Sequence, residues 1–121
     1  SRGQWGMAPC LICSGRINMA SDSANLKPFQ SYDNNVPTIT KNGTGRVLLT
    51  LPTDWINDEV NPDTCYVLVT PINSYNNSND PNPYYAWVNA WHSSSPTRLY
   101  LAYRDNTQAW DGPLYFEIKR Y

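Results

Sequence analysis

With 121 residues the chain has the length of one domain, and nine Lys and Arg residues against ten Asp and Glu residues give a net charge of −1. This balance argues against a basic surface for nucleic acid and against a polybasic membrane patch. No segment approaches the roughly 20 apolar residues of a membrane-spanning helix, and residues 1–5 lack the apolar core of a signal peptide. We therefore expect no nucleic-acid partner and no membrane insertion. The missing initiator Met indicates a fragment or a processed product.

The first third of the chain predicts few strands. Residues 1–20 form an N-terminal segment in which an apolar run is followed by an alternating stretch at residues 15–19, and this alternation predicts a first half-buried strand. Residues 21–44 are polar and rich in turn-forming residues. We interpret them as a long connection with at most one edge strand, because Pro37 is poorly tolerated in a central strand.

The main set of strands is expected within residues 45–121. Alternating or β-branched segments predict strands at residues 46–51, 64–70, 84–91, 98–103 and 114–119. Residues 73–83 are rich in Asn and Pro and predict a surface loop. The last strand is expected to run to the chain end without a tail. Helical spacing is absent, so the chain is predicted to be a single all-β domain, an antiparallel sandwich or meander, with short helices at most.

Cys10 and Cys13 have the spacing of half a zinc site. Completing it would require Cys65 and His92, which lie far apart in the sequence, unlike the usual closely spaced second pair. An odd number of cysteines also argues against a disulfide scaffold. We interpret the three cysteines as buried or half-buried thiols and predict no metal site and no cofactor.

No catalytic residue is predicted, and the chain is not expected to be an enzyme. His92 is the only histidine and is interpreted as an ordinary loop residue, since no nucleophile elbow accompanies it. Carboxylates such as Asp105, Asp111 and Glu117 leave a glycosidase pair open, because the spacing of such a pair is spatial. Solvated surface charge is the favoured interpretation.

The aromatic residues, which include nine Tyr and five Trp, are the most informative group. Their rings stack on sugars and also pack at protein interfaces. Strand alternation places Tyr85, Trp87 and Trp91 on one face. The opposite face then carries Tyr84, Ala86, Val88 and Ala90. Either face suits the core, and we expect Trp87 to be a core residue.

Two further aromatic residues fall in predicted loops. Trp110 precedes the turn signal at residues 111–112, and Tyr75 lies in the Asn-rich loop. Loops carry many binding residues, so both are candidates for a surface role. The predicted ligand contacts are Tyr75, Tyr84, Tyr85, Trp91 and Trp110.

Short motifs are spread over most of the chain from Trp5 onward. They are Trp5-Gly6-Met7-Ala8, Gly15-Arg16-Ile17, and the segments at residues 45–52, 66–71 and 111–118. Together they resemble the C-terminal tip domains of bacteriophage tail fibres. The resemblance implies a small β-sandwich at the far end of a homotrimeric fibre in the virion, which recognises a bacterial surface receptor, often a polysaccharide, through loops at the tip. The pattern does not call for the Cys10 and Cys13 pair, and it transfers no receptor residue.

The leading hypothesis is a non-enzymatic, homotrimeric receptor-binding domain that contacts bacterial glycan through loop aromatics. One alternative is a structural β-domain for fibre assembly, whose aromatics bury subunit contacts and bind no ligand. A standalone carbohydrate-binding module is another. The third is a hydrolase that uses Asp105, Asp111 or Glu117 on surface polysaccharide.

Overall fold

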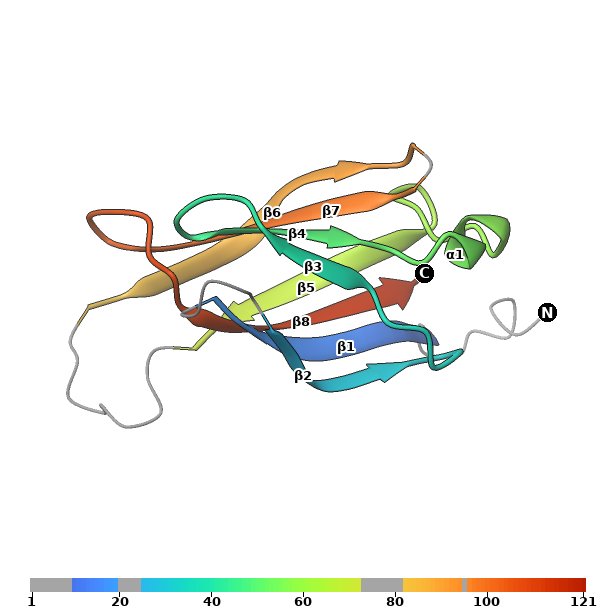
Figure 1. The fold of residues 1–121 in the computed structure, drawn as a ribbon, viewed down its shortest axis with the longest axis horizontal. Helices are drawn as coiled ribbons and strands as arrows, with labels where there is room; N and C mark the ends of the chain where they lie inside the picture. The colour runs from blue at the N-terminus through green and yellow to red at the C-terminus, as the bar shows by residue number, and fades with distance from the viewer. Residues whose placement is uncertain (1–9, 20–24, 73–81, 95) are drawn as a thin grey trace.

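A computed structural model of the chain describes residues 10–19, 25–72, 82–94 and 96–121, with the backbone alone for residues 25–28. This part of the chain forms two four-stranded antiparallel sheets (Figure 1). The first sheet has the strand order β2-β1-β8-β5, and the second sheet has the order β3-β4-β7-β6. The elements are β1 (Cys10–Asn18), β2 (Asn25–Ser31), β3 (Thr38–Lys41), β4 (Arg46–Thr50), α1 (Asp54–Asn57), β5 (Cys65–Pro71), β6 (Tyr84–His92), β7 (Arg98–Asp105) and β8 (Pro113–Arg120). The prediction of an all-β, antiparallel architecture is confirmed.

Strand alternation decides which side chains enter the core between the sheets. In β8, Leu114, Phe116 and Ile118 are buried, while Tyr115 between them is half exposed. The second sheet contributes the buried residues Val47, Leu49, Leu99, Leu101 and Tyr103. Residues 99, 101 and 103 thus share the inward face of β7, as alternation within the predicted strand at residues 98–103 requires.

Residues 21–44 contain two strands, so the prediction of at most one was wrong. β2 is an edge strand of the first sheet, and β3 is an edge strand of the second. The segment between them therefore crosses from one sheet to the other. β2 was not predicted because Pro28 and several polar residues interrupt the alternation of its sequence. Edge strands tolerate such a composition.

One end of the sandwich is closed by α1, a helix of four residues. Its Trp55 is buried, and the indole Nε1 donates a hydrogen bond to the Asp33 carboxylate at 2.8 Å. Burial opposes ionisation of Asp33, but the hydrogen bonds from Asn35, Trp55 and Ser31 outweigh it and lower the pKa of the carboxyl. The prediction that helices are short is confirmed, and no helix of the described residues is long and apolar enough to span a membrane.

A β-bulge in β6 overturns the predicted grouping of its aromatics. The register against β7 shifts between Val88 and Ala90, so the alternation changes phase there. Trp91 consequently packs against the core on the same side as Tyr84, and not beside Tyr85. Trp87 is 37% exposed, so the expectation that it is a core residue was also wrong.

Candidate functional site

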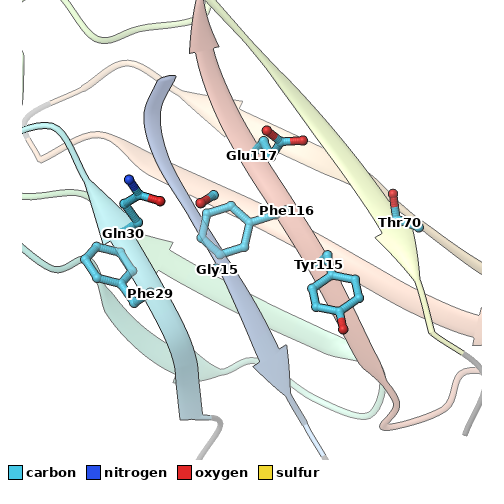
Figure 2. Close-up of a pocket in the computed structure, with 8 residues that line it drawn as sticks. Gly15, Phe29, Gln30, Thr70, Tyr115, Phe116 and Glu117 are labelled. Atoms are coloured by element: carbon cyan, nitrogen blue, oxygen red, sulfur yellow. The ribbon is translucent and has the colours of Figure 1, made fainter. Parts of the chain in front are cut away.

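The outer face of the first sheet carries a groove of about 490 Å³. Figure 2 shows that its side chains come from neighbouring strands, with Gln30 on β2, Tyr115 and Glu117 on β8, and Thr70 on β5. A cleft of this size lies within the range of small-molecule sites. The residues that line it are Ser14, Gly15, Phe29, Gln30, Thr70, Tyr115, Phe116 and Glu117.

Strand register explains why these groups meet. Ser14 in β1 pairs with Gln30 on one side and with Glu117 on the other, so the three side chains form a row across the sheet. In the next row, Tyr115 pairs with Thr70. Ser14 and Gly15 of β1 are small, so the groove is deepest there, between the longer side chains of β2 and β8. Gly15, which has no side chain, exposes backbone at the floor of the groove.

The groove combines one exposed ring with several hydrogen-bonding groups. Tyr115 is 48% exposed, and around it lie an amide, a carboxylate and hydroxyl groups. The Glu117 carboxylate has the Lys119 ammonium at 3.7 Å, a surface ion pair that contributes little to stability. This set can stack on a flat apolar surface and can donate and accept hydrogen bonds around its rim.

The predicted ligand contacts fall into three groups. Tyr85 and Trp110 are each 48% exposed. Tyr84 and Trp91 pack against the core, and the ring of Tyr84 lies 5.7 Å from that of Tyr103. Tyr75 lies outside the described residues. None of the four described candidates lines the groove, and ligand contact at each of the five stays a prediction.

A smaller hollow of about 110 Å³ lies on the second sheet. Tyr85 pairs with one of its lining residues, Arg104, and Trp110 follows another, Ala109, in the sequence. The lining of the hollow also includes Trp87 and Arg46. The connection between β7 and β8 lies at the same end of the second sheet as the turn between β3 and β4, and the two lie side by side (Figure 1).

Asp111 holds those two connections together. Its Oδ1 accepts a hydrogen bond from the backbone N–H of Gly45 at 2.7 Å and forms an ion pair with Lys41 Nζ at 2.5 Å. Burial raises the cost of charging the carboxyl, but the Gly45 N–H and the Lys41 ammonium outweigh it, and the pKa of Asp111 is lowered. Gly45 has a positive φ of 67°, and a Cβ there would lie 2.3 Å from the Tyr103 carbonyl oxygen. The backbone around Trp110 is therefore fixed in place.

The cysteines and the single histidine lie in different parts of the fold. Cys10 and Cys65 both pair with Arg120, on opposite sides of β8, so a whole strand separates them. Cys13 is buried, and burial, with a smaller effect of Asp33, raises the pKa of its thiol to about 12. His92 is the last residue of β6, so the interpretation of it as a loop residue was wrong, and its ring contacts Tyr100. No metal-binding group of three or more His, Cys, Asp or Glu residues occurs among the residues that the structure describes.

The carboxylates of the hydrolase alternative occupy different places. Asp105 Oδ1 accepts hydrogen bonds from the backbone of Thr107 and Gln108, and these two bonds lower the pKa of its carboxyl. Asp111 is engaged by Lys41 and Gly45. Glu117 lies on the outer face of the first sheet, across from Leu68 of β5.

Sequence reasoning missed most of the groove. It named Glu117, but only as a possible hydrolase carboxylate, and it left Ser14, Gln30, Thr70 and Tyr115 out. The available signal was the alternation in β8, which places Tyr115 and Glu117 opposite three buried residues. The other groove residues could not be predicted, because they meet only through the pairing of four strands from distant parts of the chain.

The chain matches no protein-family model, no curated protein and no solved structure.

Proposed function

We propose that the chain is a non-enzymatic receptor-binding domain of a bacteriophage tail fibre, located at the fibre tip in the virion, where it contacts a bacterial surface glycan. The observation that carries the proposal is the groove on the first sheet, where the exposed Tyr115 ring lies among amide, carboxylate and hydroxyl groups. A sugar offers apolar C–H faces for such a ring and hydroxyls for such a rim. The motif resemblance supports the fibre assignment.

The position of the groove suits recognition by preformed contacts. Its row of Gln30, Ser14 and Glu117 belongs to hydrogen-bonded strands, and β1 and β8 are the two central strands of the sheet. The paired backbone holds these positions at fixed spacing before a ligand binds, which favours affinity.

Adsorption to cells tests the groove. A fluorescent derivative of the chain is mixed with a panel of bacterial strains, and bound protein is measured by flow cytometry. Tyr115→Ala and Gln30→Ala are expected to reduce adsorption about tenfold each, since ring stacking and a hydrogen bond to the ligand are each worth about 1 kcal/mol or more. Thr38→Ala, on the exposed edge strand β3, is the control and should adsorb normally. Unchanged adsorption of both groove variants would overturn the groove as the receptor site.

The predicted loop aromatics are tested in the same assay. Trp110→Ala removes a ring that is 48% exposed, and Tyr75→Ala removes the candidate in the Asn-rich loop. Loss of adsorption in either variant would add that ring to the receptor contact. If both variants adsorb as the native chain does, the loop assignment fails, while the groove result stands by itself.

The proposal includes a homotrimer. Light scattering coupled to size exclusion should give a mass near three times the 13.8 kDa of the chain. A monomer that still binds glycan would instead indicate a standalone carbohydrate-binding module.

A structural role in fibre assembly is a second candidate, favoured by exposed apolar side chains on the first sheet and at its end. Leu68 of β5 is 48% exposed, and Tyr121 is 73% exposed with its ring 5.0 Å from that of Tyr66. Apolar rings and side chains of this kind are enriched at subunit contacts. Under this alternative, Leu68→Ser lowers the mass measured by light scattering, and Tyr115→Ala leaves cell adsorption unchanged.

A further inference from the structure

The hollow on the second sheet is formed by a small residue between two large ones. Ala102 of β7 pairs with Arg46 of β4 on one side and with Trp87 of β6 on the other. All three point away from the core, because the alternate residues Leu101 and Tyr103 are buried. Ala102 itself is only 2% exposed, so it forms the covered floor of the hollow, and its strand neighbours Arg46 and Trp87 are lining residues on either side.

The next row of the same face repeats the combination of cation and ring. Arg104 pairs with Tyr85 of β6 and forms an isolated bridge with Ala109. Its Nε donates a hydrogen bond to the Asp105 carbonyl oxygen at 2.9 Å, which limits the freedom of the guanidinium group. The hollow is therefore lined by two arginines, one from β4 and one from β7, and by Trp87 of β6. The exposed Tyr85 ring belongs to the adjoining row.

The charges of this face have one sign. Among the described residues that point outward from the second sheet, Arg46, Arg98 and Arg104 are charged and none is Asp or Glu. The guanidinium group of Arg46 has no ion pair or hydrogen bond to a described residue. The nearby Asp111 is neutralised by Lys41. Arg104 lies close enough to the Asp105 carboxylate to help lower its pKa, so the charge of Arg104 is partly compensated. An anion in the hollow would therefore meet the unpaired guanidinium group of Arg46 and the partly compensated one of Arg104.

We propose that this hollow binds the anionic group of an acidic sugar, a carboxylate or a phosphate, while the sugar ring contacts Trp87 and Tyr85. Guanidinium groups bind carboxylate and phosphate with paired, charge-assisted hydrogen bonds, and exposed aromatic rings stack on sugar C–H faces. A volume of about 110 Å³ accommodates the anionic group, and the ring then lies over the exposed aromatics. Asp111 and Gly45 fix the neighbouring loop, so the site is formed before the ligand arrives.

Matched acidic and neutral probes test the proposal with the purified chain. The acidic probes are a galacturonic acid tetramer and glucose 6-phosphate, and their neutral counterparts are the fully methyl-esterified tetramer and glucose. Binding is followed by the NMR shifts of the Trp87 and Trp110 indole N–H groups. We expect the acidic probes to bind at least tenfold more tightly than their counterparts, with affinity that falls as salt is added. The acidic probe that binds more tightly identifies the source as carboxylate or phosphate.

Variants locate the binding. Arg46→Gln and Arg104→Gln should each raise the Kd of the preferred acidic probe about tenfold and should leave the melting temperature unchanged, because both side chains are exposed. Arg98→Gln is the control, since Arg98 pairs with His92 and Thr50 in a more distant row of the same face. Equal binding of acidic and neutral probes, no binding of either acidic probe, or an equal loss in Arg98→Gln would overturn the proposal. The groove plays no part in it, so Tyr115→Ala should not change these affinities.

Discussion

The two outer faces of this sandwich share an architecture and differ in their charges. The first sheet presents both signs, with Glu117 beside Lys119 and Arg16 in the adjoining row. On the second sheet, the outward described residues around the hollow carry cations alone. Since the inward residues of each strand form most of the core, the charged and polar residues on the outer faces can differ between the two sheets. One core therefore supports two surfaces of different chemistry.

The largest expected effect is a loss of stability of the whole fold, on which both surfaces depend. Gly112 lies against Tyr103, and a Cβ at this position would be 2.1 Å from the ring. Tyr103 is buried and donates a hydrogen bond to the Ile72 carbonyl oxygen at 2.5 Å, so it has little room to move. Gly112→Ala should lower the free energy of unfolding by about 3 kcal/mol or more, measured by urea denaturation.

Gly43→Ala is the matched control for that experiment. Gly43 has a φ of 109°, but a Cβ added to it would have no other atom within 4 Å, so the cost of the substitution is backbone strain alone. A loss of about 1–2 kcal/mol is expected. Equal losses in the two variants would contradict the role of Tyr103 packing.

A substitution with a smaller effect on stability should weaken binding at the hollow and leave the groove unaffected. Asp111→Asn removes the charge that pairs with Lys41 and weakens the bond to Gly45. We expect a loss of about 1–2 kcal/mol in unfolding free energy, together with weaker binding of the acidic probe at the hollow. Groove binding and cell adsorption should stay unchanged, and a parallel loss at the groove would show that the faces are coupled.

Acid should affect the same connection. The folded-state pKa of Asp111 lies below its ordinary value of 3.8, so the unfolded chain takes up the proton first as pH falls. The stabilisation is complete at neutral pH and is lost as the pH falls below about 4. Urea denaturation between pH 6 and pH 3 should show a steeper decline for the native chain than for Asp111→Asn. Identical slopes would contradict this assignment.

The smallest effect on stability is expected at the groove. Glu117 and Lys119 are partly exposed, and their ion pair at 3.7 Å should contribute less than about 0.5 kcal/mol. Glu117→Gln should therefore leave the melting temperature within a degree or two while it alters adsorption to cells. A large loss of stability would mean that Glu117 supports the fold and is not a purely surface group.

The sequence was sufficient for the fold class and for most strands. Alternation predicted the strands β4, β7 and β8, because burial on one face of a strand imposes a period of two. It failed in β6, where one extra residue changes the phase and moves Trp91 into the core. It also failed for β2, whose pairing with β1 outweighs its polar composition.

The candidate sites were less predictable than the fold. Tyr85 and Trp110 were chosen for their residue type and are exposed, but the arginines around the hollow carry no distinguishing signal in the sequence. Arg46, Ala102 and Trp87 are far apart along the chain and become neighbours only through strand pairing. The groove depends in the same way on the register of Ser14 with Gln30 and Glu117.

The bulge in β6 has a consequence for how the molecule behaves at high concentration. β6 is an edge strand of its sheet, and a long regular edge is a template on which strands of other molecules can assemble into aggregates. The extra residue between Val88 and Ala90 interrupts the even spacing of the backbone groups and twists the strand. At high concentration this irregularity would protect the protein against joining edge to edge with other copies.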